Sequence, residues 1–167
     1  MKRIKLNFAL LLMIIIPFSS CEDECETFET INFEADFFTD LKSFEESDVC
    51  TGSKNLLNTQ EGSGTATLLG AFTTTITFCV DPNTFEYDNG VGSFVADNGE
   101  EIFFEGGGQV LPSDEPGYDL EFQDIFTITG GTGRFEGATG VLITDSYVNN
   151  ETQRTDHIWS GNITLKK

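Results

Sequence analysis

The sequence contains few histidines, cysteines and basic residues, which zinc and nucleic-acid sites use. It has one histidine, four cysteines and nine basic residues against 28 acidic ones. The cysteines lack zinc-ligand spacing, and no EF-hand pattern organises the loop carboxylates. We therefore predict no metal site and no cofactor. The acidic excess disfavours nucleic acid and anionic lipid headgroups as partners.

The sequence also lacks an apolar run of the roughly 20 residues that a transmembrane helix needs. Its N-terminus has Lys2, Arg3 and Lys5, then an apolar run over 8–16, then small residues before Cys21. This layout is typical of a signal peptide. The ending "FSSC" resembles a bacterial lipobox, in which the cysteine becomes the first mature residue and is acylated. An ordinary signal peptide with a coincidental cysteine is the alternative.

We accordingly divide the chain into a lipoprotein signal peptide (1–20), a lipid-anchored acidic tether (21–27) and one domain (28–167). Acyl chains on Cys21 would hold the protein on a membrane without spanning it. The expected location is the bacterial outer membrane. The acidic run "EDECETFE" resembles a signal for export to the cell exterior, although a solvated tether would have the same composition. Removal of 1–20 leaves six basic residues against 28 acidic ones, a net charge of −22.

Three cysteines remain for the oxidising compartment that a signal peptide implies. We predict a disulfide between Cys50 and Cys79, with Cys25 free or paired between molecules. Sequence fixes connectivity poorly, so three free thiols remain an alternative.

Apolar residues alternate with polar ones along three segments, "FTTTITFCV" (72–80), "YDLEFQDIFTIT" (118–129) and "TDHIWSGNITL" (155–165). A period of two is typical of β-strands. Helical periodicity is absent apart from a possible short turn within 39–47. Turn signals lie at 81–83, 88–90, 97–99, 106–108 and 112–117. The pattern predicts one all-β domain, either a sandwich or a barrel.

The glycine-rich segment "TITGGTGRFEGATG" (127–140) could suggest a phosphate-binding loop. A dinucleotide loop would need glycine where Glu136 stands, and a P-loop would need a lysine and a following helix. The next residues, "VLITDSYV", are instead a strand pattern. We therefore interpret the glycines as structural.

Gly130 and Gly131 are expected to make a turn with positive φ, with Gly133 beside it. Gly137 and Gly140 are expected to allow bulges or close strand approach. Phe135 should then face one side of the sheet, and Arg134 and Glu136 should lie side by side on the other.

"GGTGRFEGATG" (130–140) resembles the signature of allene oxide cyclase and dirigent-like barrels, especially small secreted bacterial proteins of that superfamily. "GSGTATLLGAFT" (62–73) and "VADNGEEIFF" (95–104) resemble two further segments, with Glu100 where aspartate is more usual. The resemblance implies an antiparallel barrel of about eight strands with an apolar interior. Plant members act as cyclases or as guides for stereoselective phenolic coupling. No segment matches their catalytic residues, so we assign none.

Barrels of this size can hold one small ligand or be filled by side chains. Strand parity places Asp124 among apolar residues, and it turns His157 and Trp159 inward. A carboxylate and an imidazole in one cavity could orient a ligand or transfer protons. The alternative is a bulge at Asp124 and a His157 that reaches solvent at a strand end.

Three functions remain open. The first is a non-catalytic, lipid-anchored barrel that binds a small apolar ligand or a protein partner. The second is an isomerase- or cyclase-like enzyme, or a dirigent-like protein, that uses Asp124 and His157. The third is a structural or adhesive surface protein with a filled barrel. The volume of any cavity separates the third from the others.

Overall fold

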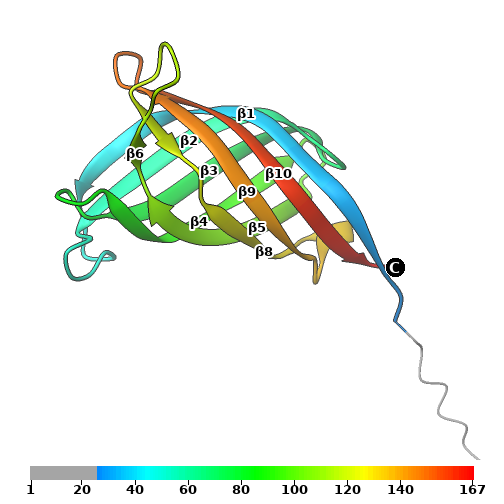
Figure 1. The fold of residues 1–167 in the computed structure, drawn as a ribbon. Helices are drawn as coiled ribbons and strands as arrows, with labels where there is room; N and C mark the ends of the chain where they lie inside the picture. Colours follow the sequence, from blue (N-terminus) through cyan, green and yellow to red (C-terminus); the bar gives the residue numbers. More distant parts are fainter. Residues whose placement is uncertain (1–25) are drawn as a thin grey trace, which may run out of the picture.

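Eight long antiparallel strands wrap into a barrel (Figure 1). The computed structural model describes residues 26–167. The long strands are β1 (Phe28–Glu46), β2 (Leu56–Ala66), β3 (Gly70–Val80), β4 (Glu86–Ala96), β5 (Glu101–Gln109), β8 (Ile125–Gly131), β9 (Thr139–Asn149) and β10 (Arg154–Lys166). Two short strands, β6 (Leu111–Pro112) and β7 (Leu120–Phe122), and a 3-10 turn, η1 (Gly133–Phe135), complete the elements.

The sheet closes because its last strand pairs with both β1 and β9. The strand order is β10–β1–β2–β3–β4–β5–β8–β9, and β9 pairs with β10 again. This confirms the all-β fold class and selects the barrel over the sandwich. The predicted signal peptide, Cys21, Cys25 and most of the 21–27 tether lie outside the described residues.

Alternation along β3 works as the sequence predicts. Phe72, Ile76, Phe78 and Val80 are buried inside the barrel, and Thr74 is buried with them. Successive side chains of a strand point to opposite faces, so a period of two gives one buried face.

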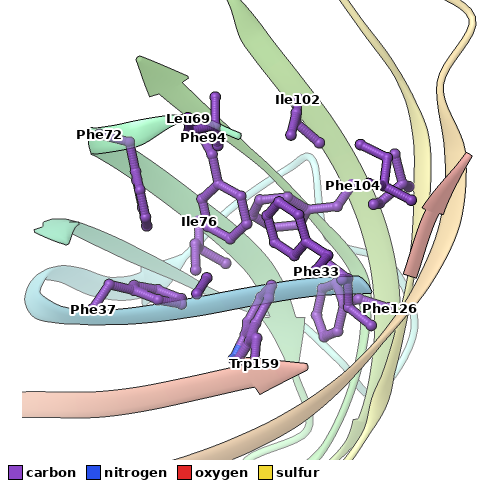
Figure 2. Close-up of a cluster of buried hydrophobic side chains, with 14 of the residues drawn as sticks. Phe33, Phe37, Leu69, Phe72, Ile76, Phe94, Ile102, Phe104, Phe126 and Trp159 are labelled. Carbon is purple, nitrogen blue, oxygen red and sulfur yellow. The ribbon is translucent and has the colours of Figure 1, made fainter. Parts of the chain in front are cut away.

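Aromatic side chains fill the half of the barrel that lies nearer the start of β1 and the end of β10. Figure 2 shows these rings directed toward one another inside the barrel. Phe94 lies among them, with its ring centroid 4.5 Å from that of Phe72 and 4.7 Å from that of Phe104. Phe33 stacks on Phe94 at 6.2 Å. This half of the interior is therefore a packed core without room for a ligand.

The glycine-rich segment forms the end of β8, η1 and the start of β9, with no helix after Gly140. Positive φ occurs at Gly133 (60°) and Gly137 (70°), which form the turn, and at Gly130 (149°) within β8. Gly131 does not adopt positive φ, so that expectation was wrong. A Cβ at Gly131 would lie 2.2 Å from the carbonyl oxygen of Glu101, so this position requires glycine because a neighbouring strand approaches closely.

Close approach also explains Gly140. A Cβ at this position would lie 2.1 Å from the carbonyl oxygen of Asn162 on β10. The prediction of close strand approach is confirmed here, at the point where β9 begins to pair with β10.

Phe135 is fully buried, as predicted, but Arg134 does not pair with Glu136. Its Nε lies 2.9 Å from Oε2 of Glu100, and its backbone N–H donates to Oε1 of Glu100. A guanidinium nitrogen of Arg134 also donates to the carbonyl oxygen of Leu68. The three segments that carry the family resemblance thus meet at one end of the barrel, where Arg134 bonds to residues of the other two segments.

Two predicted turns and the possible helical turn are strand instead. Residues 39–47 belong almost entirely to β1, which shifts register between Leu41 and Ser43. Residues 88–90 lie in β4, where the register shifts and Asn89 has φ 50°. A β-bulge needs the same permissive residues as a turn, which accounts for the error.

The glycine triplet 106–108 lies in β5, where the lack of a side chain on glycine leaves room for neighbouring residues. A Cβ at Gly106 would lie 2.7 Å from the ring of Phe126, and one at Gly108 would lie 1.9 Å from Oδ1 of Asp124. These glycines therefore leave room for Phe126 of β8 and for Asp124, which precedes β8, and they do not form a turn.

The predicted strand 118–129 is interrupted but keeps its register. Phe122 of β7 pairs with Ser146, and Ile125 of β8 pairs with Ile143, so both strands share one alignment on β9. The interruption falls at 123–124. There the backbone N–H of Asp124 donates to Oγ1 of Thr144.

The predicted disulfide is present. Cys50 and Cys79 are joined, with Cα atoms 5.5 Å apart, and both residues are buried. The bond ties the loop between β1 and β2 to the last residues of β3.

Candidate binding cavity

A cavity of about 390 Å³ occupies the half of the barrel that the aromatic core leaves open. It lies at the end opposite the start of β1 and the end of β10, where the loops after β1, β3 and β9 gather (Figure 1). Its apolar wall includes Leu41, Phe44, Val80, Phe85, Leu120 and Val148. A volume in this range suits a small organic ligand. We call this space the outer cavity.

A second, much smaller space lies deeper. It measures about 20 Å³, room for about one water molecule. Gln60, Phe78 and Phe122 line both spaces, so the two are neighbours. The rings of Phe78 and Phe122 meet edge to face, 6.0 Å between centroids. We call the deeper space the inner chamber.

A chain of hydrogen bonds runs from the wall of the inner chamber to that of the outer cavity. Trp159 Nε1 donates to Ser146 Oγ (3.0 Å), and Ser146 Oγ lies 2.8 Å from His157 Nδ1. On the other side, His157 Nε2 lies 2.9 Å from Thr39 Oγ1. Thr39 Oγ1 donates to Gln60 Oε1 (2.7 Å).

This chain determines the tautomer of His157. Thr39 uses its only proton on Gln60, so it can only accept from Nε2–H of the histidine. In a neutral ring Nδ1 then accepts the hydroxyl proton of Ser146, whose oxygen receives Trp159 N–H. The neutral form of His157 therefore carries its proton on Nε2.

Burial keeps the ring neutral. Desolvation lowers the pKa of His157 to about 3, because water cannot solvate the imidazolium inside the barrel. The nearby charge of Asp156 acts in the opposite direction but is the smaller cause. The ring also stacks on Phe37 at 4.3 Å. With both nitrogens bonded, His157 is a structural hydrogen-bonding group at physiological pH, so the expectation that it reaches solvent at a strand end was wrong.

Asp124 has separate partners. Its Oδ2 accepts the hydroxyl of Tyr87 (2.7 Å), and its Oδ1 accepts the backbone N–H of Gln109 (3.3 Å). Burial, the hydrogen bond to Asp124 and the charge of that carboxylate together raise the pKa of Tyr87 far above its ordinary value. Tyr87 lines the inner chamber and Asp124 does not.

The structure thus brings together two of the three sequence-predicted site residues. His157 and Trp159 both line the inner chamber, whereas none of the hydrogen bonds within 26–167 joins Asp124 to His157. The arrangement supplies apolar walls and neutral hydrogen-bonding groups. A proton-transfer pair formed by Asp124 and His157 is not assembled.

Sequence reasoning missed most of the polar groups around these spaces. Thr144 and Ser146 share the inward parity of Leu142 in "VLITDSYV", so hydroxyls on the buried face of a strand were the available signal. Asn58 and Gln60 lie two residues apart on β2, a strand whose glycines and polar residues hide the alternation.

Residues 26–167 hold no group of three or more histidine, cysteine or acidic side chains placed to bind a metal ion. Over the same span, no helix is both long and apolar enough to cross a bilayer.

Comparison with solved structures shows a distant structural likeness. No family profile matches the chain, and no curated protein matches it significantly in sequence. A solved structure that it resembles is that of a pterocarpan synthase dirigent protein. The two are 15% identical, the match covers 85% of this chain and 86% of the other, and the TM-score is 0.45.

Proposed function

We propose that this protein is a lipid-anchored barrel of the bacterial outer membrane that binds a small apolar molecule without transforming it. The observation that carries the proposal is the outer cavity of about 390 Å³, whose wall is largely apolar. A purely structural barrel would gain stability by filling this space, because empty apolar volume is destabilising.

The orientation of the barrel suits an anchor at Cys21. β1 begins at Phe28, at the filled end, and reaches the outer cavity near Leu41 and Phe44. A tether attached before residue 28 would leave the cavity facing away from the membrane. A small ligand could then enter from the aqueous side, either free or delivered by a partner protein.

The test uses the whole mature chain, expressed from Cys21 without acyl groups, and the neutral fluorescent probe N-phenyl-1-naphthylamine. Val148→Phe places a ring in the cavity, and Val141→Phe adds the same ring on the outer face of the same strand. We expect Val148→Phe to weaken probe binding by about tenfold or more. Val141→Phe should leave it within about twofold.

Equal binding by the two variants, or no binding by the parent protein, would contradict the proposal. Native mass spectrometry of protein from its own cells tests the anchor, since it reports the acyl mass on Cys21 together with any retained molecule.

Catalysis by an isomerase-, cyclase- or dirigent-like reaction is the alternative use of the same space. Asp124→Asn and His157→Gln distinguish it once a ligand is known: an enzyme would lose turnover while it kept binding. The saturated hydrogen bonds of His157 favour binding over catalysis.

A further inference from the structure

The wall of the outer cavity contains no ionisable side chain. Its polar members are asparagine, glutamine and threonine. An ion inside would lose its hydration without gaining a partner of opposite charge, which is costly.

The loops around the cavity mouth add a second selection by charge. They carry six acidic residues, Asp48, Asp81, Asp114, Glu115, Asp119 and Glu151, and one basic residue, Lys54. Nζ of Lys54 lies 3.7 Å from a carboxylate oxygen of Glu86 and 3.7 Å from one of Asp88, so its charge is already paired. An anion would therefore be repelled at the entrance. A cation would be drawn to the entrance but would find no carboxylate in the wall.

Two polar residues of this wall, Asn58 and Gln60, lie on the same strand, β2. Gln60 accepts from Thr39 through Oε1, and none of the hydrogen bonds among 26–167 uses its amide nitrogen. Asn58 lies two residues earlier. Within residues 26–167, its Oδ1 is the one buried side-chain nitrogen or oxygen atom that has no hydrogen-bond partner. A buried acceptor left unpaired is unfavourable, so a ligand that donates to it would bind more tightly.

From these observations we infer that the outer cavity selects a neutral, largely apolar molecule bearing a hydroxyl group. The hydroxyl lies between the two amides, where it accepts from Gln60 Nε2 and donates to Asn58 Oδ1 after a small rotation of that amide. The apolar remainder fills the space between Phe44, Val80 and Val148. This inference rests on the proposed binding function and specifies its ligand class.

The test compares three molecules of equal chain length as competitors of N-phenyl-1-naphthylamine on the mature chain at pH 8. They are 1-decanol, decanoate and decylammonium, which are neutral, anionic and cationic at that pH. Decyl methyl ether, which accepts but cannot donate, is the fourth competitor. We expect decanol to displace the probe at a concentration about tenfold lower than either ion or the ether requires.

Asn58→Leu isolates the acceptor. The variant should lose the preference for decanol over the ether, with each competitor measured against the variant's own affinity for the probe. It should be at least as stable as the parent protein, because it removes an unpaired buried acceptor. Thr59→Leu, on the opposite face of β2, is the matched control and should keep the preference.

The outcomes separate the inference from the function on which it rests. If the probe binds but decanoate or decylammonium competes as well as decanol, the ligand class is wrong and binding stands. The same holds if no decyl compound displaces the probe. If the probe itself does not bind, the proposed function fails.

Discussion

At the scale of single residues, His157 shows how burial changes the use of a titratable group. The ring is held between Ser146 and Thr39 and stacks on Phe37, so both its proton and its orientation are fixed. A histidine near neutral pH is an obvious candidate for acid–base chemistry. Here the same side chain stabilises a polar layer between the aromatic core and the outer cavity.

We predict that His157 stays neutral and Nε2-protonated down to about pH 4. Because it is the only histidine in the chain, its ring resonances can be assigned without a mutant. Nitrogen NMR of the folded protein should show one protonated and one acceptor nitrogen, unchanged between about pH 8 and pH 5. A midpoint near the ordinary value of 6.5 would contradict the burial of this ring.

The same group predicts a loss of stability in acid. The unfolded chain binds a proton at His157 near pH 6.5, and the folded chain binds it only near pH 3. The contribution to the free energy of unfolding is therefore complete above pH 6.5 and decreases by about 1.4 kcal/mol per pH unit as the pH falls toward 3. His157→Gln removes this dependence. Urea unfolding of both proteins at pH 7 and pH 4 measures the difference, since all carboxylates are common to both.

At the scale of elements, alternation was enough to predict strands but not their interruptions. The segment around Phe78 shows a clear period of two, because most of its inward positions are apolar and most of its outward positions polar. The segment around Trp159 shows it more weakly, because His157 points inward and Ile158 outward. β2 shows no such alternation, because Asn58 and Gln60, which line the cavity wall, are polar residues on its inner face. Alternation within one strand indicates which of its side chains are buried. It cannot indicate the hydrogen-bond partners of a buried polar side chain, because these partners lie on strands distant in sequence.

The glycine triplet of β5 illustrates the same limit. Its turn-like composition reflects the space that neighbouring side chains need, and that need becomes visible only once β5 and β8 are paired. The cavity residues were harder still to foresee. Asn58, Ser146 and Thr155 come from three strands and line these two spaces only when the barrel closes.

Gly108 and Asp124 should therefore be energetically coupled. Gly108→Ala would place its Cβ 1.9 Å from Oδ1 of Asp124, so the carboxylate must shift, and we expect the shift to break its hydrogen bond with Tyr87. Tyr87 would lose a charged hydrogen-bond acceptor, a cost of about 1.5–3 kcal/mol. Asp124→Ala removes the same bond without the clash. We expect the double variant to be no less stable than Asp124→Ala alone, as measured by urea unfolding. Additive losses would show that the two positions do not interact.

At the scale of the whole molecule, the barrel divides its interior between stability and binding. The aromatic rings shown in Figure 2 fill the half nearer the start of β1 and the end of β10, and the outer cavity occupies the other half. The polar layer of Thr39, Ser146 and His157 lies between them. The disulfide fastens the loop after β1 to β3 on the cavity side, where fewer core contacts are available.

This division predicts that stability and binding respond to different substitutions. Phe94 is fully buried and touches five aromatic rings, so Phe94→Ala should reduce the free energy of unfolding by about 3–5 kcal/mol. Phe103, on the outer face of β5, is 37% exposed, and Phe103→Ala should cost less than about 1 kcal/mol. Both losses are measured by urea unfolding.

Neither side chain lines the outer cavity, so both folded variants should bind N-phenyl-1-naphthylamine within about twofold of the parent protein. Val148→Phe should show the reverse pattern, with weakened binding and nearly unchanged stability. If Phe94→Ala instead abolished binding while the protein stayed folded, the aromatic half would have to shape the cavity, and the interior would act as a single unit. Retained binding in a strongly destabilised variant would establish that the packed half supports the cavity only by keeping the barrel folded.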